Sequence, residues 1–177
     1  MAGLLSNFRN TFVVSGLLAL LFVVGFFMHH GQGADAIFWQ ATFRFLHVFF
    51  GILWIGLLYY FNFVQIRKMP DIPAELKPAI SKHIAPEALF WFRWAALFTV
   101  LTGLVVAFVR GYWLEALSLG FAGGYAPGDE GFVFIGVGMW LAIVMFLNVW
   151  VFIWPNQKIA LGIVEADDAT KAKAAKT

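Results

Sequence analysis

The amino-acid sequence predicts an all-α integral membrane protein with four transmembrane helices and both termini in the cytoplasm. Of its 177 residues, 62% are apolar and only 12% are charged, whereas a soluble domain is about half apolar and about one quarter charged. This chain has more apolar surface than its own interior could hide, which excludes a soluble enzyme, a disordered regulator and a nucleic-acid-binding domain. Because the sequence contains no cysteine, it also excludes disulfides, thiolate catalysis and iron–sulfur clusters.

Four apolar stretches approach the length of about 20 residues that a helix needs to cross a bilayer. They cover about residues 11–28, 45–64, 88–109 and 132–154. We expect them to form a single membrane domain over residues 1–164, followed by a polar cytoplasmic tail at 165–177. A β-barrel would show alternating segments of about ten residues, but these stretches are continuous. The first is longer than the apolar core of a signal peptide, about 7–15 residues, so we expect it to remain as a structural helix.

The positive charges indicate which way the helices face. All Lys and Arg residues except Arg44 and Arg110 fall on one side of the four predicted spans. Cytoplasmic loops carry the excess of Lys and Arg, so we expect the loops at 29–44 and 110–131 to face the periplasm. This pattern favours a multi-pass protein of the bacterial inner membrane.

Prolines are expected to interrupt the cytoplasmic segments. Four of them lie between Met69 and Pro86, and proline disrupts a helix interior. We therefore expect only short helices in this segment, with Ala79–Ile84 along the membrane surface. For the same reason we expect Pro155 to end the fourth helix.

Polar residues within the membrane are expensive, so they point to contacts with other helices or to function. In the second span, side chains at spacings of three and four form one stripe of a helix. Its members are Arg44, His47, Gly51, Trp54, Leu58, Asn62 and Gln65. Because lipid is a poor environment for His, Asn and Gln, we expect this face to point into the bundle or at a partner subunit.

His47 is the main candidate for chemistry. A neutral imidazole at its depth suits an axial haem ligand, and Arg44, one turn outward, suits a haem propionate. Gly51 would let a flat ring approach the backbone, and Arg110 is a second candidate for the propionates. Met139 lies near the depth of His47, as does the glycine at position 103, and is a candidate second axial ligand. A hydrogen bond from His47 to a neighbouring helix, another metal site at this histidine and a proton relay remain alternatives.

Two further polar residues have structural interpretations. Arg93, at the start of the third span, is expected to extend toward the membrane surface or to pair with Glu87. Asn148, in the fourth span, is expected to form a hydrogen bond to another helix.

Three runs of residues carry a more specific signal. They are Arg44-Phe-Leu-His-Val48 continuing to Trp54-Ile-Gly56, Pro86-Glu-Ala-Leu-Phe-Trp-Phe-Arg-Trp94, and Asn148-Val-Trp-Val-Phe-Ile-Trp-Pro-Asn-Gln-Lys158. These runs resemble the amino-terminal membrane domain of bacterial cytochrome c-linked urate oxidases. The stretch from His47 to Tyr60 is also distantly similar to the haem-binding helix of membrane protoporphyrinogen oxidases. The resemblance implies that His47 binds haem b.

These observations lead to three alternative functions. The first is a small membrane subunit of an electron-transfer assembly, holding haem b near the periplasmic side and exchanging electrons with a periplasmic cytochrome c or a larger membrane complex. The second is a cofactor-free accessory subunit that stabilises a larger membrane enzyme. The third is a membrane oxidase of the urate oxidase type without its cytochrome c domain, since the chain contains no Cys-x-x-Cys-His motif. No catalytic residues are visible, and the expected surroundings are membrane lipid rather than nucleic acid.

Overall fold

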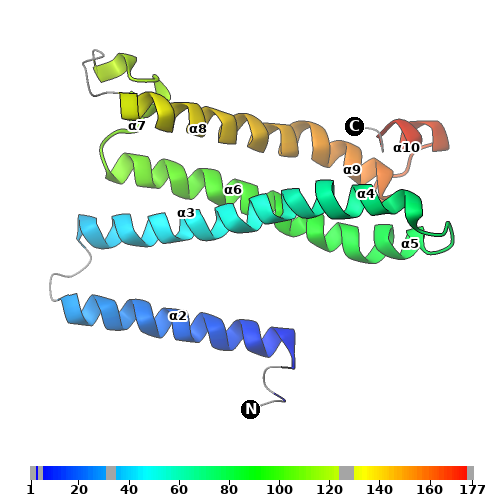
Figure 1. Cartoon of the computed structure of the whole chain (residues 1–177), viewed down its shortest axis with the longest axis horizontal. Coiled ribbons are helices and arrows are strands. Elements are labelled where there is room, and N and C mark those ends of the chain that lie inside the picture. The colour runs from blue at the N-terminus through cyan, green and yellow to red at the C-terminus, as the bar shows by residue number, and fades with distance from the viewer. Residues whose placement is uncertain (1–2, 4–5, 31–34, 124–129, 175–177) are drawn as a thin grey trace. The chain divides into compact units, whose positions relative to one another are not determined.

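The computed structural model describes residues 3, 6–30, 35–123 and 130–174. Helices and short turns make up these ranges, and no strand occurs within them. Four helical stretches are long and apolar enough to cross a membrane: Phe8–His29, Ala36–Asp71, Lys77–Val109 and Glu130–Ala160. Figure 1 shows these stretches as the long ribbons of the molecule. The chain is therefore all-helical, as predicted, with four helices of membrane-spanning length.

The chain divides into two compact units, Met1–Thr42 and Phe43–Thr177. The first contains α2 (Phe8–His30) and the beginning of α3 (Ala36–Tyr59). Asp35 caps α3, since its Oδ1 accepts the backbone N–H of Phe38 at 2.8 Å. The rings of Phe27 and Phe38 meet edge to face at 5.4 Å between centroids, so the end of α2 contacts the beginning of α3.

The second unit is a bundle formed by the remainder of α3 with α6 (Ala85–Val109) and α8 (Glu130–Leu147). Its core joins Trp54 of α3 to Phe92, Ala95 and Ala96 of α6 and to Val149, just beyond α8. Trp54 is only 2% exposed. The two alanines allow helix backbones to approach closely, as small residues do in membrane bundles.

Each of the three long helices in the bundle contains a stretch of π-helix. α3 continues through η1 (Tyr60–Gln65) into α4 (Ile66–Lys68) and η2 (Met69–Asp71). α5 (Lys77–Ala79) and η3 (Ile80–Ile84) lead into α6, and η5 (Asn148–Ile153) joins α8 to α9 (Trp154–Ala160).

The predicted effect of two of the prolines was wrong, although the chain does leave the helix between Asp71 and Lys77, where Pro73 lies. Pro86 and Pro155 lie within continuous helices, each at the beginning of an α-helical stretch that follows a π-helical one. Proline has no N–H and its ring presses on the carbonyl four residues back, whereas a π-turn uses a wider spacing of hydrogen bonds. The wider turn accommodates the proline, so Ala79–Ile84 continues into α6 and the fourth helix extends past Pro155.

A short helix covers one end of α8. α7 (Trp113–Leu117) follows α6 and lies against α8, and η4 (Phe121–Gly123) comes after it. Gly136 permits this contact, because a Cβ there would collide with the carbonyl oxygen of Ala116. The indole Nε1 of Trp140 donates to the carbonyl of Leu117 at 2.9 Å. The loop that leaves α6 is therefore attached to α8 by both packing and a hydrogen bond.

The polar tail is partly helical. α10 (Asp168–Ala174) lies against α9, and Ala174 is buried. The described part of the predicted polar tail thus contains a short helix that packs on the preceding one.

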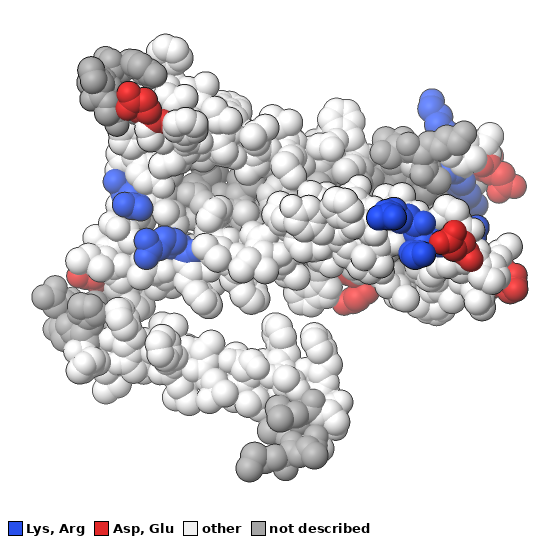
Figure 2. Space-filling view, in the orientation of Figure 1, with Lys and Arg blue, Asp and Glu red and all other residues white. Residues whose placement is uncertain are grey.

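Positive charge gathers at the end of the second unit that carries α4, α5, α9 and α10, which we name the basic end (Figure 2). Arg44 lies in α3 near the opposite end, and Arg110 follows the last residue of α6. The basic residues of the basic end are Arg67, Lys68, Lys77, Lys82, Lys158, Lys171 and Lys173.

Candidate functional site

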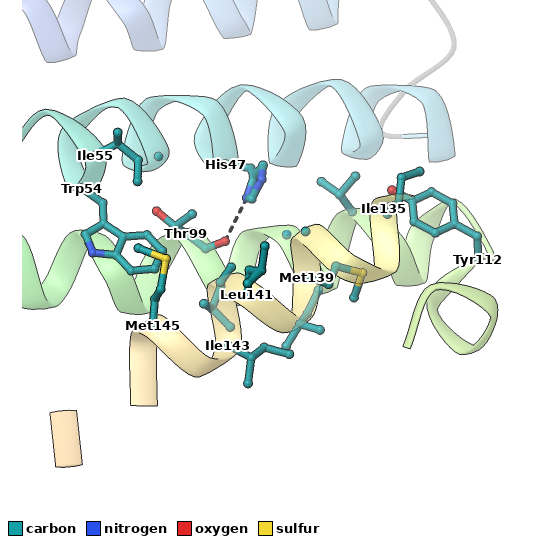
Figure 3. A pocket seen from close by; sticks show the side chains of 17 residues that line it. His47, Trp54, Ile55, Thr99, Tyr112, Ile135, Met139, Leu141, Ile143 and Met145 are labelled. Carbon is teal, nitrogen blue, oxygen red and sulfur yellow. Dashed lines mark hydrogen bonds between the residues drawn. The ribbon is translucent and has the colours of Figure 1, made fainter. Parts of the chain in front are cut away.

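His47 joins α3 to α6 through a hydrogen bond. Its Nδ1 lies 2.9 Å from the backbone carbonyl oxygen of Thr99, and Figure 3 shows the ring extending from α3 toward that carbonyl. Gly103 provides the space for the ring. A Cβ at this position would lie 2.9 Å from His47 Cε1 and 3.0 Å from Nδ1, so the absence of a side chain at Gly103 lets the imidazole reach Thr99.

This hydrogen bond determines the protonation pattern of the neutral ring. The carbonyl oxygen of Thr99 can only accept, so Nδ1 must carry the hydrogen and donate it. Nε2 of the neutral ring then has an available lone pair, and no hydrogen bond reaches it from the described residues. A ring held by one nitrogen with the other one free is the usual arrangement of a histidine that ligates a metal.

The ring borders an apolar cavity of about 470 Å³ among α3, α6 and α8. This volume lies within the range of about 300–1,000 Å³ that is typical of ligand sites. Figure 3 shows the lining side chains, with Tyr112 near one end and Trp54 and Met145 near the other. The lining residues are His47, Gly51, Trp54, Ile55, Thr99, Val100, Gly103, Leu104, Val106, Tyr112, Ile135, Gly138, Met139, Leu141, Ala142, Ile143 and Met145.

Three predicted site residues therefore meet in one cavity: His47, Gly51 and Met139. Gly51 leaves space beside His47, since the nearest atom to a Cβ there would be Thr99 Cγ2 at 3.9 Å. Gly138 also borders the cavity, and a Cβ there would have no atom within 4 Å. The imidazole, the thioether and the glycine surfaces fit a flat, largely apolar group such as haem.

The two arginines predicted to meet propionates do not line the cavity. Arg44 and Arg110 are both exposed. The guanidinium carbon of Arg110 lies 5.8 Å from the ring centroid of Tyr112, and Tyr112 is a lining residue. Arg110 is thus connected to the margin of the cavity, whereas Arg44 is linked to it only by its position one turn before His47.

Trp54 has an unsatisfied polar atom beside the cavity, which the sequence interpretation missed. Its indole Nε1 is buried and has no hydrogen-bond partner, although buried polar atoms are normally paired. The sequence feature that could have indicated this role is the position of Trp54 in the same stripe as His47 and Gly51. An N–H donor at this position could serve a polar atom of a bound group.

The remaining stripe residues behave differently. Asn62 is exposed, and its side chain donates to the carbonyl of Leu58 in the same helix at 2.8 Å. Asn148 is also exposed and forms no hydrogen bond to another helix in the described part of the chain. The predicted interhelical role of Asn148 was therefore wrong, whereas the inward-facing part of the stripe continues past Trp54 to Leu58, which packs on the core, and to Gln65, whose Oε1 is buried.

Arg93 does not pair with Glu87. The indole Nε1 of Trp91 donates to Glu87 Oε1 at 2.9 Å, whereas the guanidinium carbon of Arg93 lies 3.2 Å from the ring centroid of Trp154. Arg93 is only 8% exposed, so its side chain packs against Trp154 within the bundle.

Within the described ranges, no group of three or more His, Asp or Glu side chains could hold a metal ion. His47 and Met139, on separate helices, are the candidate ligands that share the cavity. In comparisons with protein families, with curated proteins and with solved structures, no match to this chain was found.

Proposed function

We propose that this protein is a small membrane subunit of an electron-transfer assembly, and that it binds haem b in the cavity beside His47. The observation that carries the proposal is the hydrogen bond from His47 Nδ1 to the carbonyl of Thr99. It holds the ring in place and leaves the Nε2 lone pair for a metal. The adjoining apolar cavity of about 470 Å³ supports the same interpretation.

Each nearby residue has a role in this proposal. His47 would hold the haem iron through its free nitrogen, Met139 could offer a thioether from the other helix, and Gly51 would leave room for a flat ring. Arg44 and Arg110, which lie outside the apolar cavity, would neutralise the propionates. When bound, the haem supplies one-electron chemistry, while the chain sets its ligation, burial and access to water.

The proposed partners follow from this role. The electron partner is a periplasmic cytochrome c or a larger membrane complex, as the resemblance to urate oxidases implies. We propose no substrate for this chain, because the cavity is lined almost entirely by apolar side chains, with His47 and Tyr112 as its titratable residues.

The second candidate function is a cofactor-free accessory subunit of a larger membrane enzyme. The observation that favours it is the fit between His47, Thr99 and Gly103, which is a sufficient structural role for a histidine. In this case the imidazole stabilises the contact between α3 and α6, and such a hydrogen bond contributes about 0.6 kcal/mol on average in a membrane protein.

Reduced-minus-oxidised visible spectra of the purified full chain, produced with sufficient haem, distinguish the two functions. We expect a b-type α-band in the wild type that is absent in His47→Ala and shifted or weakened in Met139→Leu. His83→Ala is the matched control, because His83 is an exposed histidine outside the cavity. The absence of any band in the wild type would leave the accessory subunit as the better explanation.

A second measurement tests the propionate contact. We expect Arg44→Leu to lower the haem midpoint potential, because it removes a positive charge that would stabilise the reduced, less positive haem relative to the oxidised one. Lys68→Leu, at the basic end, is the control. An unchanged potential in Arg44→Leu would remove Arg44 from the site.

We further propose that both termini are cytoplasmic and that the protein is inserted in the bacterial inner membrane. The bias of Lys and Arg toward the basic end supports this orientation. A tag fused after Thr177 should be protected from protease added to intact cells and cleaved after the cells are permeabilised. Cleavage in intact cells would reverse the proposed orientation.

A further inference from the structure

Arg93 is a buried cation whose partner in the described structure is an aromatic ring. Its side chain is 8% exposed, and its guanidinium carbon lies 3.2 Å from the ring centroid of Trp154. This cation–π contact compensates only part of the hydration that a buried guanidinium loses. Arg93 forms no hydrogen bond or ion pair with any described residue, so its N–H donors remain available.

A second cation lies over the same ring. The Nζ of Lys158 is 5.7 Å from the ring centroid of Trp154, on the turn of α9 that follows the tryptophan. The ion pair found in the described ranges joins Lys68 to Asp71 at 3.2 Å and involves neither cation. Both cations thus contact the same indole, and neither forms an ion pair with a carboxylate in the described ranges, so an anion at this place would be attracted by both.

The donors can be reached from outside. Among the described residues, the buried side-chain nitrogens without a partner belong to Trp54 and Trp150. The guanidinium nitrogens of Arg93 also lack partners but are not sealed from the surface. The N–H donors of Arg93 are therefore incomplete without a further molecule.

We propose that Arg93 and Lys158, placed around Trp154, bind the phosphate group of an anionic phospholipid. A guanidinium offers parallel N–H donors that match phosphate oxygens, and the ammonium adds a second charge. Trp154 supplies an apolar face with a polar edge, which suits the boundary between acyl chains and headgroups. The site would take phosphatidylglycerol or a related acidic lipid, and it is independent of the haem proposal.

The position of the site identifies lipid as the expected source of the phosphate. Arg93 and Trp154 lie toward the basic end of helices that are long and apolar enough to cross a membrane. Figure 2 shows Lys and Arg side chains at this end, and basic pockets between helices on the cytoplasmic side recognise acidic headgroups. A free phosphate ion would meet the same donors but would gain nothing from the adjoining apolar surface.

Native mass spectrometry of the full chain in mild detergent, titrated with phosphatidylglycerol or phosphatidylcholine, tests the proposal. We expect one phosphatidylglycerol to bind more tightly than phosphatidylcholine. Lys158→Gln should weaken its binding about fivefold, as expected for one cation near an acidic headgroup. Arg93→Gln should weaken it further. Arg67→Gln is the matched control, because Arg67 is an exposed cation of the basic end without a contact to Trp154.

Three results would overturn the proposal. Equal losses in Lys158→Gln and Arg67→Gln would indicate diffuse attraction instead of a site. Equal binding of the two lipids would exclude selectivity for an acidic headgroup. Thermal stabilisation by inorganic phosphate, abolished in Lys158→Gln and not reproduced by phosphatidylglycerol, would identify a free ion as the ligand. If Arg93→Gln loses helical circular dichroism, Arg93→Lys replaces it, and Lys158→Gln still decides the result.

Discussion

Gly103→Ala should destabilise the protein only when His47 is present. The new Cβ would lie 2.9 Å from Cε1 and 3.0 Å from Nδ1 of the imidazole, closer than carbon and nitrogen atoms tolerate. The ring cannot yield freely, because its Nδ1 donates to the carbonyl of Thr99 at 2.9 Å. Relief of the collision therefore requires either loss of that hydrogen bond or separation of α3 from α6.

The expected magnitude follows from three terms. Replacing glycine by alanine inside a helix gains about 1 kcal/mol. Losing an interhelical hydrogen bond in a membrane costs about 0.6–1.7 kcal/mol, and forcing an extra carbon into a packed position costs about 1–3 kcal/mol. Gly103→Ala should thus lower the free energy of unfolding by about 1–3 kcal/mol in the wild type. In His47→Ala it should raise it by up to about 1 kcal/mol.

A double-mutant cycle measures this change of sign. The free energy of unfolding of the four proteins is obtained by denaturant titration in detergent, with tryptophan fluorescence and circular dichroism as readouts. Gly56→Ala is the matched control, since a Cβ at Gly56 would have no atom within 4 Å. Equal destabilisation by Gly103→Ala with and without the imidazole would refute the reasoning, because it would show that the ring does not occupy this space.

Two other positions give sharp expectations. Gly136→Ala should lower the free energy of unfolding by about 1–3 kcal/mol, because its Cβ would meet the backbone oxygen of Ala116; Gly138→Ala, with no atom within 4 Å of its Cβ, should be neutral or stabilising. The N–H of Thr170 donates to Asp167 Oδ1 at 2.6 Å and holds the pKa of the Asp167 carboxyl below its ordinary value of 3.8. The carboxylate therefore stabilises α10 fully above the ordinary pKa, and this stabilisation is lost as the pH falls through the lower pKa of the folded state. In the wild type, hydrogen exchange of the Thr170 amide should accelerate as the pH falls through that lower pKa. In Asp167→Asn this pH dependence should be absent.

Contradictory outcomes are equally specific. Equal unfolding free energies for Gly136→Ala and Gly138→Ala would show that α7 does not press on α8. An unchanged resonance of the Trp140 indole N–H in Gly136→Ala would show the same locally, since this group donates to Leu117. If Thr170 exchange keeps its acid dependence in Asp167→Asn, another group governs the first turn of α10.

Much of the site could be predicted from its spacing along the chain. Residues three or four apart share a helix face, so the sequence placed His47, Gly51 and Trp54 together, and the structure has all three on the cavity. Estimated depths brought Met139 near His47, and both border the same cavity. Asn62 departed from the pattern because its side chain donates to the carbonyl of Leu58 in its own helix, and spacing alone does not reveal whether a polar side chain bonds to its own helix or to another.

The prolines show a different limit. A local rule predicts that Pro86 and Pro155 break a helix, because each removes a hydrogen bond and crowds the preceding turn. The π-helical stretches before them supply the needed space. This choice depends on packing along the whole helix, so the two residues alone could not indicate it.

The sequence by itself determined that the chain is helical and has four helices of membrane-spanning length. An apolar stretch can satisfy its backbone in a bilayer only by internal hydrogen bonds, so length and composition suffice for this conclusion. Only the tertiary structure decided what the buried polar groups contact. The partners of His47 and Arg93 are the carbonyl of Thr99 and the ring of Trp154, 52 and 61 positions away in the chain. Contacts between residues so far apart in the chain depend on how the helices pack against one another, and no local sequence pattern specifies that packing.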